Sequence, residues 1–264
     1  MDGFAKLLTI VTSLIIALGL PLLTFLGVQK FFLEPRYEAR ATRRKYATAL
    51  YLACKELSLH LGHTLERLNS TGSRVGDAMK KIPNNDFRGN PAWFTKDGYY
   101  TTLTAYKIAA VSAWLRIYQS ALLFSAYPAS QSFLNDLYGR SQNLKIAFST
   151  GTCLWYYYFD AIGERLVEDD AKLASVLTFA KFCGRYANET DFRLFFEQLH
   201  MYIWFLGNKD PKYLATLPRI QECLDDLIGF LERRNLLAGF QVERPRASMD
   251  ELEKAVAEGW TGSR

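Results

Sequence analysis

Residues 47–68 read ATALYLACKELSLHLGHTLERL, and their hydrophobic pattern decides the fold class of this 264-residue chain. Apolar side chains recur in this stretch at steps of three and four residues, which is the spacing of one face of an α-helix. They are Ala47, Leu50, Cys54, Leu57, Leu61, Leu65 and Leu68. The pattern belongs to a longer predicted helix that starts near Arg36 and ends near Asn69, where Asn-Ser-Thr-Gly interrupts it.

Helical spacing also dominates the rest of the chain. We expect further helices over residues 101–126, 129–138, 144–167, 172–186, 191–206 and 218–231, and a last short one up to residue 258. Glycine and proline recur through residues 70–98, so we expect a long irregular loop there, with a short helix near residues 75–81. No stretch alternates polar and apolar residues between turn signals as a strand would. The sequence therefore predicts an all-α fold.

The composition excludes several classes of protein. Hydrophobic residues make up 49% and aromatic residues 14% of the chain, which is too rich in core-forming side chains for an intrinsically disordered protein. The four cysteines are far apart and form no C-x-x-C pair, so a disulfide scaffold is excluded and buried reduced thiols are expected. The 32 basic and 27 acidic residues are unevenly distributed, because none lies between Leu7 and Val28.

Leu7 to Val28 is therefore a predicted transmembrane helix. At 1.5 Å per residue this uncharged run extends about 33 Å, enough to cross a hydrocarbon core of about 30 Å. It is longer than the apolar region of a signal peptide and no cleavage motif follows it, so a retained anchor is favoured over a cleaved leader. Thr9, Ser13 and Ala17 form a line of small residues that suits either an ordinary lipid-facing helix or self-association of the span.

Basic residues cluster directly after this span, where they set its orientation. The cluster consists of Lys30, Arg36, Arg40, Arg43, Arg44 and Lys45. By the positive-inside rule the amino terminus lies outside and the large domain is cytosolic, at a bacterial inner membrane or a plasma membrane. The cluster can act as a topology signal alone, or it can also bind anionic lipid headgroups. Because the membrane accounts for the net charge of +5, no nucleic-acid partner is expected.

These patterns divide the chain into five parts. Residues 1–29 form the anchor, 30–69 the basic segment with the long helix, and 70–100 the irregular loop. Residues 101–240 form a helical bundle, and 241–264 form a linker with the short C-terminal helix.

One helix face brings together polar residues that could carry chemistry. Glu56, His60, His63 and Arg67 fall within about 60° of each other on the predicted helix. Two histidines beside a carboxylate could ligate a metal ion or serve as a general acid and base. The same face points away from the leucine stripe, as an ordinary solvated surface would. No confident metal, cofactor or catalytic residue follows from this pattern.

A second group of charged residues lies among apolar ones. Asp160 and Glu164 are four residues apart and could be paired carboxylates with raised pKa values. Arg116 lies in an apolar stretch, where a buried guanidinium needs a partner. We therefore expect a buried ion pair between Arg116 and Asp160 or Glu164.

No sequence motif names a reaction. The chain lacks the phosphate-binding, dinucleotide-binding, zinc-protease, serine-hydrolase and calcium-loop patterns. The sequence favours a membrane-anchored interaction, scaffold or regulatory module that binds a protein partner or its own copies. The alternatives are an oligomerising effector that perturbs the bilayer, and an enzyme or metal-binding protein with a site near Glu56, His60 and His63.

Overall fold

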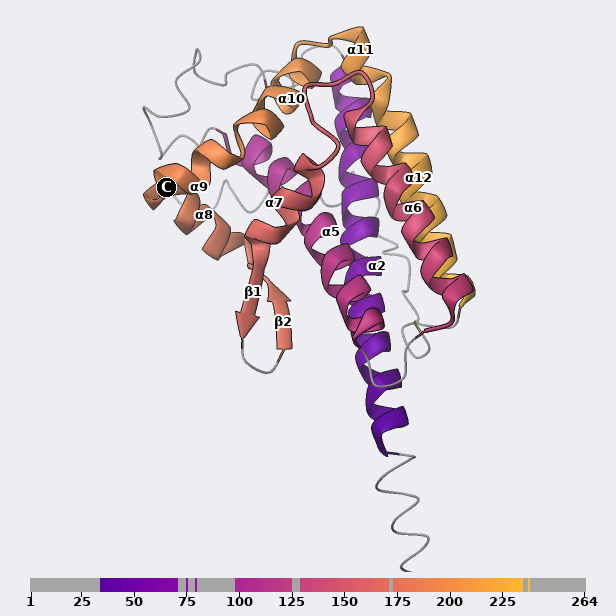
Figure 1. Cartoon of the computed structure of the whole chain (residues 1–264). Helices are drawn as coiled ribbons and strands as arrows, with labels where there is room; N and C mark the ends of the chain where they lie inside the picture. Colours follow the sequence, from indigo (N-terminus) through magenta and orange to yellow (C-terminus); the bar gives the residue numbers. More distant parts are fainter. Residues whose placement is uncertain are drawn as a thin grey trace, which may run out of the picture.

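The computed structural model describes residues 34–70, 75, 79, 98–124, 129–170, 173–234 and 237. The described part is predominantly helical, which confirms the predicted all-α class (Figure 1). The helices are α2 (Glu34–Asn69), α5 (Tyr99–Leu123), α6 (Gln131–Ser149), α7 (Tyr158–Leu166), α8 (Phe179–Asn188), α9 (Thr190–Phe195), α10 (Glu197–Gly207), α11 (Pro211–Leu214) and α12 (Thr216–Arg233).

The long helices α2, α5, α6 and α12 form the body of the domain (Figure 1). Helix α2 packs against both α5 and α12, and α12 also packs against α6. The predicted leucine stripe faces this interior, since Ala47, Leu50, Cys54, Leu57, Leu61 and Leu68 are all buried. Polar contacts align α2 with α12, where the Tyr51 hydroxyl donates to Glu232 Oε1 over 2.9 Å.

The shorter elements cover the other side of α5. Helix α7 packs directly on α5, and α8, α9 and α10 build an aromatic cluster beside it. The ring centre of Phe182 lies 5.4 Å from the ring centre of Phe192 and 5.2 Å from that of Phe196. The chain bends at Phe196, whose φ of −91° and ψ of 6° separate α9 from α10. A single helix over residues 191–206 was therefore a wrong prediction, and the bend lets both rings pack on Phe182.

Three other helix predictions were wrong in their boundaries. The helix predicted over residues 172–186 begins only at Phe179, as α8. Helix α6 runs without interruption from Gln131 to Ser149, where two separate helices were expected. The chain then turns at Gly151, which has a φ of 76°, so no helix continues from 144 to 167.

Two elements of the described part were not predicted: the short helix α11 and an antiparallel hairpin, which takes the place of the first residues of the helix predicted over 172–186. Strand β1 (Val167–Asp170) pairs with β2 (Leu173–Val176), with Val167 opposite Val176 and Glu168 opposite Ser175. Most of β1 is acidic, so it lacks the polar–apolar alternation that marks a strand. The hairpin is attached to α5 because the Tyr106 hydroxyl donates to the carbonyl of Leu177 over 2.9 Å.

The predicted span Leu7–Val28 lies outside the described residues, as does the predicted C-terminal helix. Among the helices that the structure describes, none is both long and apolar enough to cross a membrane. Most of the predicted loop 70–100 also lies outside, although Val75 and Met79 are helical and buried.

The ends of α5 and α12 and the start of α6 lie at one end of the domain, which we call the basal end. Helix α2 passes this end near Arg43, and its first turns extend beyond the body of the molecule (Figure 1). Leu123 and Phe124 at the end of α5 are exposed, and 86% of Phe124 is accessible to solvent.

Candidate functional site

Part of the predicted polar face of α2 meets α5, and Glu56, His60 and His63 each have a protein partner. Glu56 pairs with Lys107 over 2.9 Å, and His63 lies 3.5 Å from Glu66. The Nε2 atom of His60 lies 2.7 Å from the Thr104 hydroxyl. The structure therefore directs these side chains to different partners.

The hydrogen bonds around His60 define a neutral network between α2 and α5. The Thr104 hydroxyl donates to the carbonyl of Tyr100, so His60 Nε2–H donates to Thr104. The rings of His60 and Tyr100 also pack with their centres 4.8 Å apart. Burial, with smaller effects of Lys107 and His63, lowers the pKa of His60 to about 4. A histidine whose pKa lies so far below 7 is poorly matched to acid–base catalysis near pH 7.

The described residues offer no ready metal site. They contain no group of three or more histidine, cysteine, aspartate or glutamate side chains that could hold an ion. The geometry around Glu56, His60 and His63 therefore supports a helix contact better than a metal centre.

The second predicted group is arranged differently from the expected buried pair. Arg116 does lie 3.4 Å from Glu164, but both side chains are about half exposed or more. Asp160 instead pairs with Lys145 over 2.7 Å, and Lys145 is the buried member of that pair. Arg116 escapes burial because it lies on the exposed face of α5, although its neighbours along the sequence are buried.

Most of the predicted membrane-surface cluster lies on the first three turns of α2. Arg36, Arg40, Arg44 and Lys45 are exposed, whereas Arg43 is turned toward the bundle and partly buried. Lys30 and the line Thr9, Ser13 and Ala17 lie outside the described residues. Within this cluster Arg43 is therefore distinct in its surroundings.

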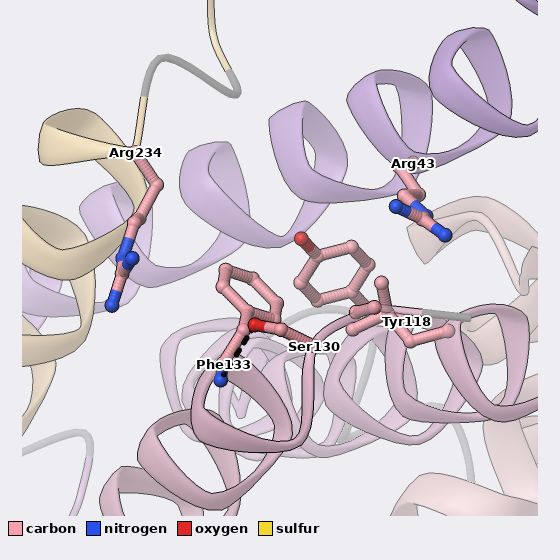
Figure 2. A pocket seen from close by; sticks show the side chains of 7 residues that line it. Arg43, Tyr118, Ser130, Phe133 and Arg234 are labelled. Atoms are coloured by element: carbon pink, nitrogen blue, oxygen red, sulfur yellow. Dashed lines mark hydrogen bonds between the residues drawn. The ribbon is translucent and has the colours of Figure 1, made fainter. Parts of the chain in front are cut away.

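Arg43 lines a pocket of about 210 Å³ at the basal end, to which all four of the long helices or their flanking residues contribute. Arg43 comes from α2, Tyr118 from α5, Ser130 and Phe133 from the start of α6, and Arg234 from the end of α12. Figure 2 shows Phe133 and Tyr118 lying between the two arginines.

Two groups in this pocket lack hydrogen-bond partners. The Nε and Nη2 atoms of Arg43 are buried without one, and so is the hydroxyl of the fully buried Tyr118. Burial raises the pKa of Tyr118, although Arg43 opposes the shift, so this phenol stays protonated and can donate a hydrogen bond. Arg234 is engaged differently, since its Nη2 lies 3.1 Å from Asp136.

An aromatic patch lies where α6 leads into α7. Tyr138, Trp155 and Tyr157 in this patch are exposed, and Tyr156 is partly buried. Trp155 is 74% exposed and Tyr157 is 79% exposed. Tyr156 packs edge-on against Tyr157 at 5.1 Å. Burial raises the pKa of Tyr156, and the nearby Tyr138 and Asp160 raise it further.

Sequence reasoning missed both the pocket and the patch. It named Arg43 only as one of six similar basic residues, and it assigned the run Tyr156–Phe159 to a helix interior. The spacing of residues along a helix predicts which face a side chain lies on. It does not predict which neighbouring element that side chain contacts.

Comparison with protein-family models, with curated proteins and with solved structures finds no match for this chain. The geometry of the described residues is therefore the basis for assigning a function.

Proposed function

We propose that this protein is a single-pass membrane protein whose cytosolic helical domain acts as an interaction or scaffold module. The aromatic patch of Tyr138, Trp155, Tyr156 and Tyr157 carries this proposal. Tyrosine and tryptophan are the residues most enriched at the energetic centres of protein interfaces. In this reading the patch binds a protein partner or a second copy of the chain.

The loop that presents the patch is held in place by its own contacts. Leu154, which directly precedes Trp155 in the sequence, is buried, with 5% of its surface accessible. The Thr152 hydroxyl donates to the carbonyl of Phe148 over 2.6 Å and accepts from the amide of Leu154 over 3.1 Å. A loop that is ordered before binding loses less conformational entropy when a partner binds.

Features of the basal end support the membrane tether. The uncharged run Leu7–Val28 precedes α2 in the sequence, and the exposed basic residues of α2 begin only eight residues after it, at Arg36. Phe124 and Tyr37 are exposed aromatic residues near the same end, where a membrane interface would accommodate them.

A photo-crosslinking experiment on the full chain in native membranes tests the proposal. A photoreactive phenylalanine analogue replaces Tyr157 in one variant and Leu59 in a control, since Leu59 is 60% exposed on α2 but lies outside the patch. We expect a discrete crosslinked product from position 157 only, and a product of twice the chain mass would identify a second copy. Trp155→Ala should then reduce its yield about tenfold or more. Equal products from both positions, or none from 157, would contradict the proposal.

A further inference from the structure

The basal pocket contains hydrogen-bond donors that the protein itself does not satisfy. Arg43 has two buried nitrogen atoms without acceptors, and Tyr118 has a buried hydroxyl without a partner. A buried unpaired guanidinium or hydroxyl is costly, so such groups are normally matched by a partner. None of the described residues that line the pocket is acidic. An acceptor that enters the pocket would satisfy these donors, and a negatively charged one would also match the guanidinium.

The surroundings of the pocket add positive potential. The N-terminus of the 19-residue helix α6 opens into it, with the N-cap Ser130 among the lining residues. The Phe133 amide donates to the Ser130 hydroxyl over 3.3 Å, so the amides of Gln131 and Ser132 are the ones in the first turn without an intrahelical partner. Such free amides at a helix N-terminus favour anions. Arg234 contributes a second guanidinium on the opposite side of the pocket (Figure 2). Its contact with Asp136 leaves part of the guanidinium fork for another acceptor.

The number of converging donors indicates a phosphate group. Donors come from three separate elements: Arg43 on α2, Tyr118 on α5 and the N-terminus of α6, where the Ser130 hydroxyl can still donate its own proton. A carboxylate has two oxygen atoms, whereas a phosphate monoester has three terminal oxygens that can accept from three directions. A guanidinium also matches phosphate geometry in a bidentate manner. The volume of about 210 Å³ is below the range of pockets for drug-sized ligands, which fits a phosphate with a small attached group.

We propose that the basal pocket binds a phosphate group through Arg43, Tyr118 and the N-terminus of α6. The phosphate can belong to a small soluble molecule or to a lipid headgroup. Arg43 lies nine residues after the start of α2, about 14 Å along the helix axis, so a lipid phosphate reaches it only if the basal end approaches the bilayer closely. This inference goes beyond the proposed function and does not depend on the aromatic patch.

The soluble source is tested with inorganic phosphate on the full chain in detergent. We expect phosphate to raise the melting temperature relative to chloride at equal ionic strength, because a ligand that binds the folded state stabilises it. Arg43→Gln should raise the dissociation constant at least tenfold. Arg44→Gln is the matched control, since it removes the same charge from the adjacent, exposed position and should change the constant less than twofold.

The lipid source is tested with the same variants in nanodiscs that contain phosphatidic acid or, at matched surface charge, phosphatidylserine. Phosphatidic acid carries a phosphate monoester, so a preference for it that Arg43→Gln abolishes and Arg44→Gln retains identifies a headgroup as the ligand. Tyr118→Phe should weaken binding of whichever ligand, inorganic phosphate or phosphatidic acid, gives a positive result. It should not lower the melting temperature in chloride, because the lost hydroxyl has no partner in the protein. Equal effects of Arg43→Gln and Arg44→Gln, or no phosphate effect in either arm, would overturn the proposal.

Discussion

His200 is fully buried in the aromatic cluster of α8, α9 and α10, and this environment fixes its charge. Its Nδ1 lies 2.9 Å from the carbonyl of Phe196, which can only accept, so Nδ1–H is the donor. The Tyr186 hydroxyl also contacts the ring, at 2.8 Å from Nδ1 and 3.2 Å from Nε2. Burial lowers the pKa of His200 to about 4, against the opposing effect of the Phe196 carbonyl. The folded protein therefore keeps this histidine neutral at pH 7.

A neutral buried histidine predicts a loss of stability in mild acid. The unfolded chain takes up a proton on His200 near pH 6.5, whereas the folded protein does so only near pH 4. The free energy of unfolding should therefore fall as the pH decreases from 6.5 to 4, by up to about 3 kcal/mol for this group. Denaturant unfolding at several pH values measures it. His200→Gln should flatten the dependence relative to wild type, while His63→Gln, at a partly exposed position, should not; identical slopes for the two variants would refute the interpretation.

Residue types and spacing predicted which side chains share a helix face, but not what those faces meet. The sequence placed Glu56, His60 and His63 together on α2, yet α5 covers His60 and supplies Lys107 to Glu56. The sequence also predicted a pair between Arg116 and Asp160 or Glu164, and Arg116 does contact Glu164. The two side chains are exposed because no other element that the structure describes covers that side of α5. Such partners come from the packing of distant segments, which one sequence does not specify.

At the scale of elements, long periodic helices could be predicted and their interruptions could not. The stripe that predicted α2 is buried except for Leu65, which is partly buried, because three- and four-residue spacing is a strong signal over many turns. The bend at Phe196 and the hairpin at Val167 depend on tertiary contacts instead. The ring of Phe196 packs against Phe182, and Tyr106 on α5 donates a hydrogen bond to Leu177, the residue after the hairpin. A local pattern carries no information on either contact.

Helices α5 and α7 approach each other closely at Gly163, which makes this contact sensitive to a single methyl group. A Cβ atom at Gly163 would lie 2.8 Å from the backbone nitrogen of Ala113 and would also overlap Ser112. Gly163→Ala should therefore destabilise the fold by about 1 to 3 kcal/mol through overpacking. Gly139→Ala on α6 is the control, because its Cβ would meet nothing within 4 Å and alanine favours the helix by about 0.5 to 1 kcal/mol. Thermal unfolding compares the two; a stabilised Gly163→Ala would show that the helices are not in this contact.

At the scale of the whole molecule, the two ends of the domain differ in what they present. The basal end combines exposed basic residues of α2 with exposed Leu123 and Phe124, whereas α11 and the start of α12 lie at the opposite end (Figure 1). The sequence predicted the basic cluster but not that the end of α5 and the start of α6 would join it. That convergence depends on the antiparallel packing of helices far apart in the chain.

Exposed basic residues lie at both ends, but the predicted span Leu7–Val28 precedes α2, so we expect only the basal end to respond to anionic lipid. In nanodiscs carrying the full chain, backbone amides of residues 36–45 should exchange more slowly when anionic lipid replaces zwitterionic lipid, because each basic residue near the surface contributes about 1 kcal/mol of attraction. Amides of α11 should be unaffected, and hydrogen-exchange mass spectrometry resolves the two regions. Joint replacement of Arg36, Arg40 and Arg44 by glutamine should abolish the slowing. The same replacement of three exposed basic residues at the far end, Lys209, Lys212 and Arg219, should leave it intact. Slowing that persists without the basal arginines, or that appears equally in α11, would mean that the basal end does not face the bilayer.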